Sequence, residues 1–512
     1  MKVIIVGGVA GGATAAARIR RLNEHAEITV FERSGYISYA NCGLPYYIGD
    51  VITDPEELTL QTPESFFKRF HINMKIHHEV ISIHPERKTV SVKNLENGEI
   101  FEEKYDKLIL SPGAKPTQPR LPGVGIDKLF TLRTVEDTFR IKEYINKNHP
   151  KSAVLAGGGF IGLELAENLR ELGMDVTIVQ RPKQLMNPFD PDMASMIHNE
   201  MRKHGIKLVL GYTVEGFKEK DNGVEVLLKD NPSLQADMVV LAIGVTPDTV
   251  LAKEAGLELG IKESIVVNDR METSVPDIYA AGDAVQVKHY VTGNDALISL
   301  AGPANKQGRI IADNICGGDS RYLGSQGSSV IKVFDMTAAT TGINETNAKK
   351  SGLEVDTAIH AGLNATQLKD LDLAYAPPYS SAKDPVNMAG FMIDNIAKGT
   401  LKQWHLEDMD KISKDKDVVL LDVRTVGEFS MGHIDGFKNI PVDELRERIS
   451  EIEKGKPVYL ICQSGLRSYI ASRILEGNGY ETYNFSGGFR FYDAVVNDRA
   501  LIERAYACGM DY

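Results

Sequence analysis

The sequence is poor in cysteine, and the few cysteines that it has are far apart. Its 512 residues include four of them, Cys42, Cys316, Cys462 and Cys508, and none has the close spacing of metal ligands. Scattered thiols cannot form the disulfide framework of a small secreted domain, and they suit a reducing compartment. We therefore interpret the cysteines as thiols and predict no metal site.

Other absences narrow the class of protein further. No apolar run reaches the length of a membrane span, and a formal net charge of −12 disfavours nucleic acid as a partner. The opening stretch MKVIIVGGVAGG runs directly into glycines, which indicates a buried strand and not a signal peptide. We expect a cytoplasmic protein without membrane or nucleic-acid partners. Its 43% hydrophobic residues and 46 glycines are typical of a globular chain with several domains and many tight turns.

The first motif is a glycine-rich turn between a strand and a helix. The apolar run KVIIV is followed by GGVAGG and then by the helical stretch ATAAARIRRL. Val9 stands where the middle glycine of G-x-G-x-x-G is expected, so close approach to a pyrophosphate depends on Gly7, Gly8, Gly11 and Gly12. Glu32 follows Gly12 by about 20 residues, the place of a ribose-binding carboxylate. Such a turn can also be purely structural.

A second copy of the motif favours the nucleotide-binding interpretation. The stretch SAVLAGGGFIGLELAENL carries all three expected glycines, Gly157, Gly159 and Gly162. The next strand ends at Gln180, followed by Arg181. A neutral side chain beside a guanidinium favours NADPH, or use of both NADH and NADPH, because a 2′-phosphate could pair with the arginine. Arg181 as a merely solvated residue is the alternative.

Further stretches indicate a nucleotide domain that is split in the chain. YDKLILSPGAKP ends a strand before Gly113, where the chain would cross into the second nucleotide domain, and MVVLAIGVTPDT would bring it back. VPDIYAAGDA ends another strand at Gly282 and Asp283. A carboxylate there can accept a hydrogen bond from the ribityl chain of FAD, and the helix that follows can direct its N-terminus at the pyrophosphate.

These stretches, in this order, resemble the pyridine-nucleotide disulfide oxidoreductase superfamily of two-dinucleotide flavoproteins. Within it, YISYANCGLPYYIGD has Cys42 with no second cysteine after it; together with GGVAGGATAAARIRRL and AYAPPYSSAKDPVNMAG it resembles the coenzyme A disulfide reductases. The resemblance implies FAD, NADH or NADPH, and a mixed disulfide of coenzyme A on Cys42. NADH peroxidase and oxidase relatives have a histidine in the first helix, and here no histidine precedes His25. A buried structural Cys42 is the other alternative.

The resemblance also implies where coenzyme A and a partner subunit would contribute. In that fold the helix ARIRRL lies close to Cys42, so Arg18 and Arg21 are candidates for the phosphates of coenzyme A, with Gln61 and Arg69 as weaker ones. Tyr375 of AYAPPY matches a tyrosine that the family places near the partner's active site. A homodimer is therefore expected.

The C-terminal part carries its own cysteine motif. DVRTVGEFSMGHIDGFKNIPVDEL and VYLICQSGLRSYIASRILEGNGYETYNFSGGF resemble a rhodanese domain. Cys462 ends a strand, and QSGLRS leads into a helix, so backbone N–H groups would point at a thiolate or persulfide, with Arg467 adding positive charge.

We predict an α/β protein with two Rossmann-like dinucleotide-binding domains, a shortened α+β dimerisation domain and an α/β rhodanese domain. The boundaries are 1–115 and 236–325 for FAD, 116–235 for NAD(P)H, 326–398 for dimerisation and 405–512 for the rhodanese domain. The dimerisation segment lacks the middle strands of the resembling family, so a weakened dimer is expected. The predicted activity is NAD(P)H-dependent reduction of coenzyme A disulfide, coenzyme A persulfide or polysulfide at Cys42. The alternatives are an NADH oxidase or peroxidase and a redox or sulfur-carrier protein without turnover.

Overall fold

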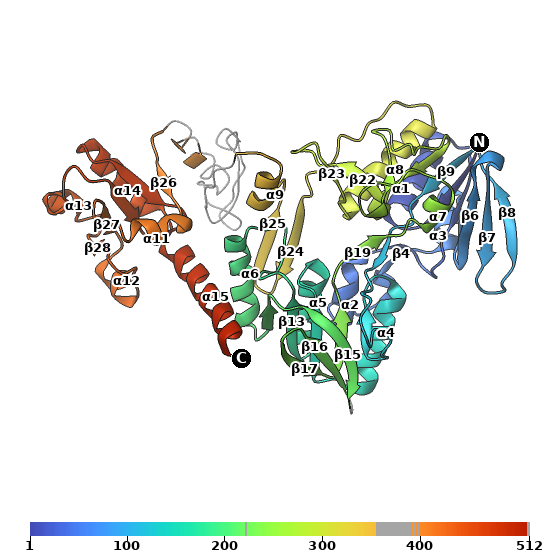
Figure 1. Cartoon of the computed structure of the whole chain (residues 1–512). Helices are drawn as coiled ribbons and strands as arrows, with labels where there is room; N and C mark the ends of the chain where they lie inside the picture. Colours follow the sequence, from blue (N-terminus) through green and yellow to red (C-terminus); the bar gives the residue numbers. More distant parts are fainter. Residues whose placement is uncertain (221–222, 355–391, 394, 397–398, 509–512) are drawn as a thin grey trace. The chain divides into compact units, whose positions relative to one another are not determined.

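The computed structural model describes residues 1–220, 223–354, 392–393, 395–396 and 399–508 (Figure 1). The described chain forms two compact units. One is Met1–Leu353 with the chain end from Ile502, and the other is Glu354–Leu501. Each unit has its own hydrophobic core.

The first sheet of the larger unit is parallel throughout. Its order is β21-β9-β1-β2-β5, from β1 (Lys2–Val6), β2 (Glu27–Phe31), β5 (Asn73–Lys75), β9 (Lys107–Leu110) and β21 (Ile278–Ala280). Strand β1 is buried because helices cover this sheet, which is why KVIIV has no polar alternation. Strand β21 comes from far later in the chain and pairs with β9, so the sheet is built from two separate segments.

Two helices lie against each other beside this sheet, α1 (Ala10–Leu22) and α8 (Ala301–Ile315) (Figure 1). A Cβ on Gly308 would lie 2.4 Å from the carbonyl oxygen of Gly11, so glycine at this crossing permits the close approach of the two backbones. Smaller elements complete this part: β3 (Ile37–Tyr39), β4 (Thr59–Gln61), α3 (Pro63–Phe70), β6 (His78–His84), β7 (Thr89–Asn94), β8 (Ile100–Lys104), β20 (Ile265–Val266), β22 (Val285–Lys288) and β23 (Asp295–Ala296).

A second parallel sheet has the order β11-β18-β12-β13-β14. Its elements are β11 (Leu129–Thr131), α4 (Val135–Asn148), β12 (Ser152–Ala156), α5 (Phe160–Glu171), β13 (Asp175–Gln180), α6 (Pro191–Lys203), β14 (Lys207–Leu210) and β18 (Met238–Leu241). An antiparallel sheet adjoins it, formed by β15 (Val214–Lys220), β16 (Gly223–Leu228) and β17 (Asn231–Ala236). The chain passes between the two parallel sheets through β10 (Ala114–Pro116) and β19 (Val245–Pro247), and these two strands pair antiparallel. Helix α7 (Val250–Glu254) follows β19. The predicted pair of Rossmann-like units is confirmed, while their residue boundaries stay predictions.

Of the predicted dimerisation segment, the structure describes a hairpin, β24 (Ser329–Val333) and β25 (Met336–Thr340), and the helix α9 (Glu345–Lys350). The hairpin is attached to α5 through Glu167, whose buried carboxylate accepts a hydrogen bond from the Phe334 N–H at 2.9 Å and pairs with Lys332. Most of 355–398, including Tyr375, lies outside the described residues.

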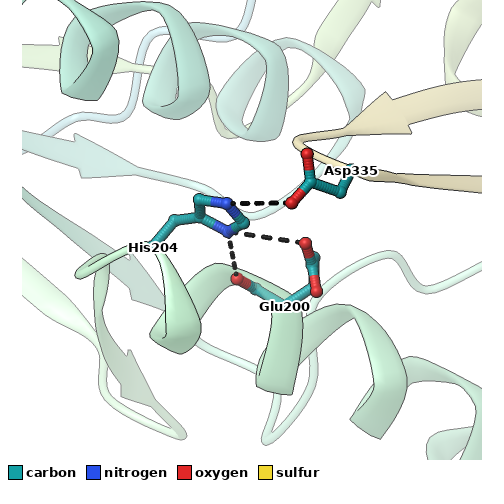
Figure 2. Close-up of side chains that lie close together, drawn as sticks. All are labelled: Glu200, His204 and Asp335. Atoms are coloured by element: carbon teal, nitrogen blue, oxygen red, sulfur yellow. Dashed lines mark hydrogen bonds and ion pairs between the residues drawn. The ribbon is translucent and has the colours of Figure 1, made fainter.

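The turn of the hairpin also contacts the end of α6 (Figure 2). His204 stacks on Phe334 with ring centroids 4.0 Å apart, and its Nε2 lies 3.5 Å from Oδ2 of Asp335. Its Nδ1 faces the backbone carbonyl of Glu200 at 3.0 Å. Lys203 Nζ lies 3.4 Å from carboxylate oxygens of both acids, so a protein cation already pairs with them. The cluster therefore fastens the hairpin to α6.

The smaller unit contains a parallel sheet of order β26-β30-β29-β27-β28. Its elements are β26 (Gln403–Trp404), α11 (Met409–Ile412), β27 (Val419–Asp422), α12 (Val426–Met431), β28 (Lys438–Asn439), α13 (Leu445–Arg448), β29 (Val458–Ile461), α14 (Leu466–Gly477) and β30 (Thr482–Phe485). The last helix, α15 (Gly488–Cys508), belongs to this unit as far as Leu501. Trp404 is buried against Phe485, and its Nε1–H donates to the Leu460 carbonyl at 3.3 Å. The sheet thus begins just before the predicted start at residue 405.

Candidate active sites

The backbone fixes the shape of the first glycine turn. Gly7 has a φ of +96°, and a Cβ there would lie 2.1 Å from the carbonyl oxygen of Ser111. A Cβ on Gly12 would lie 2.0 Å from the carbonyl oxygen of Gly7, and one on Gly11 would lie 2.8 Å from Ser111 Oγ. Gly7 and Gly12 are therefore required by the fold itself.

The second turn repeats this geometry and adds one difference. Gly157 has a φ of +120°, and a Cβ on Gly162 would lie 2.1 Å from its carbonyl oxygen. A Cβ on Gly159, in contrast, would meet no atom within 4 Å. Packing within the chain therefore does not require Gly159, and its missing side chain leaves an open face, as a bound pyrophosphate would need.

The two predicted ribose-binding side chains occupy equivalent places. Glu32 follows β2, and its Oε2 accepts the Gly8 N–H at 2.8 Å. Gln180 ends β13, and its Oε1 accepts the Gly158 N–H at 3.0 Å. Each side chain thus holds its own glycine turn in place and keeps further lone pairs for a ribose. Arg181 is exposed beside Gln180.

The helices that follow these turns lack caps. Helices α1 and α5, and also α8, have no side-chain cap and no acidic residue in the first turn. By contrast, α3 and α4 have complete capping boxes at Thr62 and Thr134. Uncapped first-turn N–H groups need a partner, and a pyrophosphate is a suitable one. The residues present therefore fit FAD at the first turn and NAD(P)H at the second.

The ends of β9 and β21 bring further predicted residues to the first turn. Gly113 and Gly282 both have positive φ, +70° and +85°. Asp283 Oδ2 accepts a hydrogen bond from Arg133 Nη2 at 2.5 Å, so the predicted ribityl acceptor is also part of an ion pair. Arg133 also donates from Nε to the Ala114 carbonyl at 3.1 Å. Sequence analysis missed Arg133 because it comes from the second nucleotide domain.

Cys42 lies in a short 3-10 helix, η1 (Asn41–Gly43), directly before α2 (Leu44–Ile48). Its side chain is exposed and free. Partial desolvation by the surrounding protein, and then the carboxylate of Glu164, raise the pKa of the Cys42 thiol, and Arg133 opposes them. Next to it, Oδ1 of Asn41 is buried without a hydrogen-bond partner, which is unusual unless a bound molecule supplies the donor.

Glu164 is a second residue that sequence analysis missed. It lies on α5, which packs closely against α2: a Cβ on Gly49 would lie 2.1 Å from Oδ1 of Asn168. Burial, and then the nearby charge of Glu167, raise the pKa of Glu164 to about 7. A carboxyl that titrates near neutral pH therefore acts on the Cys42 thiol.

The predicted coenzyme A contacts do not gather into one group. Arg18 is paired with Asp313 of α8, with Nε 2.8 Å from Oδ1. Arg21 and Arg69 are exposed, and Gln61 accepts a hydrogen bond from Ser65. Arg18 therefore has a protein partner, whereas Arg21 and Arg69 present their charges to solvent. All four assignments stay predictions.

The loop that we call the Cys462 loop, residues 462–468, surrounds the second candidate sulfur. Cys462 is buried at the end of β29. Its Sγ accepts hydrogen bonds from the Gly465 N–H at 3.1 Å and from the Ser468 hydroxyl at 3.2 Å. Gly465 has a φ of +98° and begins α14 without a side-chain cap. These donors stabilise a thiolate or a persulfide anion.

Arg467 forms a two-pronged ion pair. Its Nη1 and Nη2 each donate to a different carboxylate oxygen of Glu428, both at 2.7 Å. The pair holds the pKa of Glu428 well below its usual range, at about 2. Glu428 and the charges of Cys462 and Asp422 raise the pKa of Arg467. Sequence analysis identified Arg467 but not its partner.

Two dinucleotide-binding turns, a thiol site and a separate sulfur-anion loop define a redox enzyme with an attached sulfurtransferase-type domain. Residues 1–308 match the family described as Pyridine nucleotide-disulphide oxidoreductase, and residues 405–494 match the Rhodanese-like domain. The chain belongs to the pyridine nucleotide-disulphide oxidoreductase family. It is an oxidoreductase that uses FAD and a pyridine nucleotide.

Comparisons with individual proteins agree with this assignment. A coenzyme A disulfide reductase of Staphylococcus aureus (strain JH9) is 34% identical over 440 residues, covering 76% of this chain and 99% of that protein. The structure of reduced Bacillus anthracis CoADR-RHD has a TM-score of 0.93 and 44% identity, covering 97% of this chain and 98% of that one. An NAD-dependent persulfide reductase from A. fulgidus has a TM-score of 0.87 and 33% identity, covering 96% and 100%.

Among the described helices, none is both long enough and apolar enough to cross a membrane.

Proposed function

We propose that this enzyme uses NAD(P)H to reduce small disulfides, persulfides or polysulfides at Cys42, and that Cys462 carries sulfane sulfur as a persulfide. One observation carries the proposal, the surroundings of two thiols. The exposed Cys42 is within electrostatic reach of Arg133, which pairs with Asp283. Cys462 accepts two hydrogen bonds inside an anion-binding loop. The similar proteins are described as reductases of coenzyme A disulfide and of a persulfide. Coenzyme A disulfide, coenzyme A persulfide and polysulfide are therefore the candidate substrates.

In this proposal the residues around Cys42 control its thiolate. The Cys42 thiolate attacks one sulfur of the substrate, an S–S bond forms, and the other half leaves as a thiolate or, from a persulfide, as sulfide. Arg133 stabilises the attacking anion, whereas a charged Glu164 opposes it. Bound FAD would supply the two electrons, taken from NAD(P)H, that regenerate the thiolate and release the second thiol.

The nucleotide preference follows from the end of β13. Gln180 carries no charge that would repel a 2′-phosphate, and Arg181 is exposed at the adjacent position. We expect appreciable use of NADPH, with NADH as an alternative donor.

We also infer a homodimer that is weaker than those of longer relatives. The alignment with the Staphylococcus aureus protein is 440 residues long, but it covers only 76% of this 512-residue chain. The Staphylococcus aureus protein therefore has residues without a counterpart here. The proposed role of Tyr375 across the dimer depends on residues outside the described part of the chain. Light scattering over a dilution series, measured together with turnover, tests this inference; a tight dimer at nanomolar concentration contradicts it.

The decisive experiment is anaerobic oxidation of NADPH and NADH with coenzyme A disulfide, coenzyme A persulfide, polysulfide or peroxide as the only oxidant. We expect turnover with one or more of the sulfur substrates and none with peroxide. Turnover with peroxide alone, or with oxygen alone in a parallel aerobic assay, would identify an NADH oxidase or peroxidase. Binding of FAD without turnover on any substrate would identify a carrier or sensor protein.

A further inference from the structure

Glu428 pairs with Arg467 of the Cys462 loop and thereby changes the net charge of that loop. It is on the first turn of α12, where its Oε2 also accepts from the Thr425 N–H at 3.0 Å and the Thr425 hydroxyl at 2.9 Å. Its carboxylate is therefore held in place from its own helix while it accepts both Arg467 N–H groups. A bidentate pair of this kind is geometrically specific.

The pair removes the net charge that the loop arginine would otherwise provide. Glu428 is ionised at neutral pH, since its pKa is about 2. The neighbouring Arg424 is neutralised as well, by the buried carboxylate of Asp422 with Nη2 2.7 Å from Oδ2. A small dianion would thus have to draw Arg467 out of an existing pair before it could use the guanidinium.

The two helices that carry this pair also expose apolar side chains. Val426 and Met431 of α12 are 60% and 85% exposed, and Leu466 and Ile470 of α14 are 57% and 42% exposed. Exposed apolar side chains on the same two helices as a neutralised ion pair favour a donor with an organic body over a compact inorganic anion.

We propose that Glu428 is a specificity-determining residue that makes the Cys462 site select persulfides of organic thiols over thiosulfate. This inference rests on the proposed function of Cys462 as a sulfur carrier. The Cys462 thiolate attacks the terminal sulfur of R–S–SH and forms a new S–S bond. The S–S bond of the donor breaks, and the thiol R–SH leaves with the proton, so that Cys462 holds a persulfide anion. No external oxidant or reductant is needed.

The test compares sulfur transfer to cyanide from thiosulfate and from glutathione persulfide in the full-length holoenzyme. In Glu428→Gln the glutamine keeps the capping contact at α12 but removes the charge. We expect the ratio of kcat/KM for thiosulfate to kcat/KM for glutathione persulfide to rise at least tenfold. Thiosulfate transfer should also become more sensitive to salt, since a free guanidinium now attracts the dianion. Glu451→Gln, which breaks an exposed pair with Arg448, is the matched control and should leave the ratio unchanged.

A second substitution tests whether the effect acts through Arg467. In Glu428→Gln combined with Arg467→Gln the gain for thiosulfate should disappear. Arg490 is another exposed arginine, and its backbone N–H donates to the Gln463 carbonyl of the loop at 3.2 Å. A gain that survives Arg467→Gln but is lost with Arg490→Gln, or an unchanged ratio in Glu428→Gln, overturns the proposal. Mass spectrometry of Cys462 distinguishes failure of this inference from failure of the proposed function. If neither donor forms a persulfide on Cys462 in the unsubstituted enzyme, the proposed function itself fails.

Discussion

Cys42 and Cys462 are both free thiols, but the residues around them affect the two thiolates in opposite ways. At Cys462 a backbone N–H and a hydroxyl point at the sulfur, so the loop itself stabilises a buried sulfur anion. At Cys42 burial and Glu164 disfavour the thiolate, and Arg133 alone among the named groups favours it. The comparison indicates that Cys462 can hold a persulfide unaided, whereas the chemistry of Cys42 depends on what is bound beside it and on pH.

The largest expected effect comes from removing the exposed thiol. Cys42→Ser should lower NAD(P)H-dependent disulfide reduction by roughly a thousandfold or more, as is typical when a nucleophile is lost. The FAD absorption spectrum should be unchanged, because the thiol acts in the chemistry and not in binding FAD. Sulfur transfer at Cys462 should persist. Cys316→Ser is the control, and retained reduction in Cys42→Ser would refute the assignment.

The converse substitution tests the independence of the two thiols. Cys462→Ser should reduce sulfur transfer to cyanide by about a hundredfold or more, since no other described thiol has donors arranged around its sulfur. Reduction of coenzyme A disulfide should change less than about twofold, because separate domains keep separate cores. Both rates are measured on the same preparation. Loss of both activities together would mean that the two sites work as one.

Ser468→Ala tests the loop itself. The substitution removes the hydroxyl that donates to Cys462 Sγ and leaves the Gly465 N–H in place. Hydrogen bonds to charged groups contribute about 1.5–3 kcal/mol, so sulfur transfer should slow by roughly tenfold or more. The rate of Cys462 alkylation at neutral pH should fall in parallel. An unchanged alkylation rate would show that Ser468 does not stabilise the thiolate.

The sequence predicted both glycine turns because their chemistry is local. Gly7, Gly12, Gly157 and Gly162 are required by backbone positions within one strand–turn–helix unit, and that requirement is visible in a short motif. Glu32 and Gln180 lie at a regular distance from their turns, and each accepts a hydrogen bond from its own turn, while their ribose contacts stay predictions.

The missed residues act across elements that are distant in sequence. Arg133 reaches Asp283 from the second nucleotide domain, and Glu164 acts on Cys42 from α5. Glu428 forms its ion pair with Arg467 from a different helix of the rhodanese domain, α12. No spacing rule connects such residues, since only the folded chain brings them together. Arg18 is a case of the opposite kind: its position in the sequence suggested a phosphate contact, which stays a prediction, and did not reveal its ion pair with Asp313.

A smaller effect is expected on the choice between NADPH and NADH. In the proposed function, only the reaction at Cys42 needs this nucleotide. Arg181→Ala should lower the ratio of kcat/KM for NADPH to that for NADH by about fivefold, in line with one solvent-exposed charge pair. Sulfur transfer at Cys462 should not change. Lys183→Ala, which removes a cation two residues further along, is the control. A ratio that does not move, or a large prior preference for NADH, would show that Arg181 is only solvated.

The smallest effect concerns the charge that acts on Cys42. Because the pKa of Glu164 is about 7, its carboxyl is mostly neutral at pH 6 and mostly charged at pH 8. The charged form raises the pKa of the Cys42 thiol, so Glu164→Gln should lower that pKa and speed Cys42 alkylation at pH 8. At pH 6 the substituted and unsubstituted enzymes should react at nearly the same rate.

Alkylation is followed by mass spectrometry on the reduced holoenzyme, where Cys462 serves as an internal standard that should not respond. Glu171→Gln, an exposed carboxylate on the same helix, is the matched control. If Glu164→Gln slows alkylation at pH 8, or changes the rates of both cysteines equally, Glu164 does not act on Cys42 through its charge.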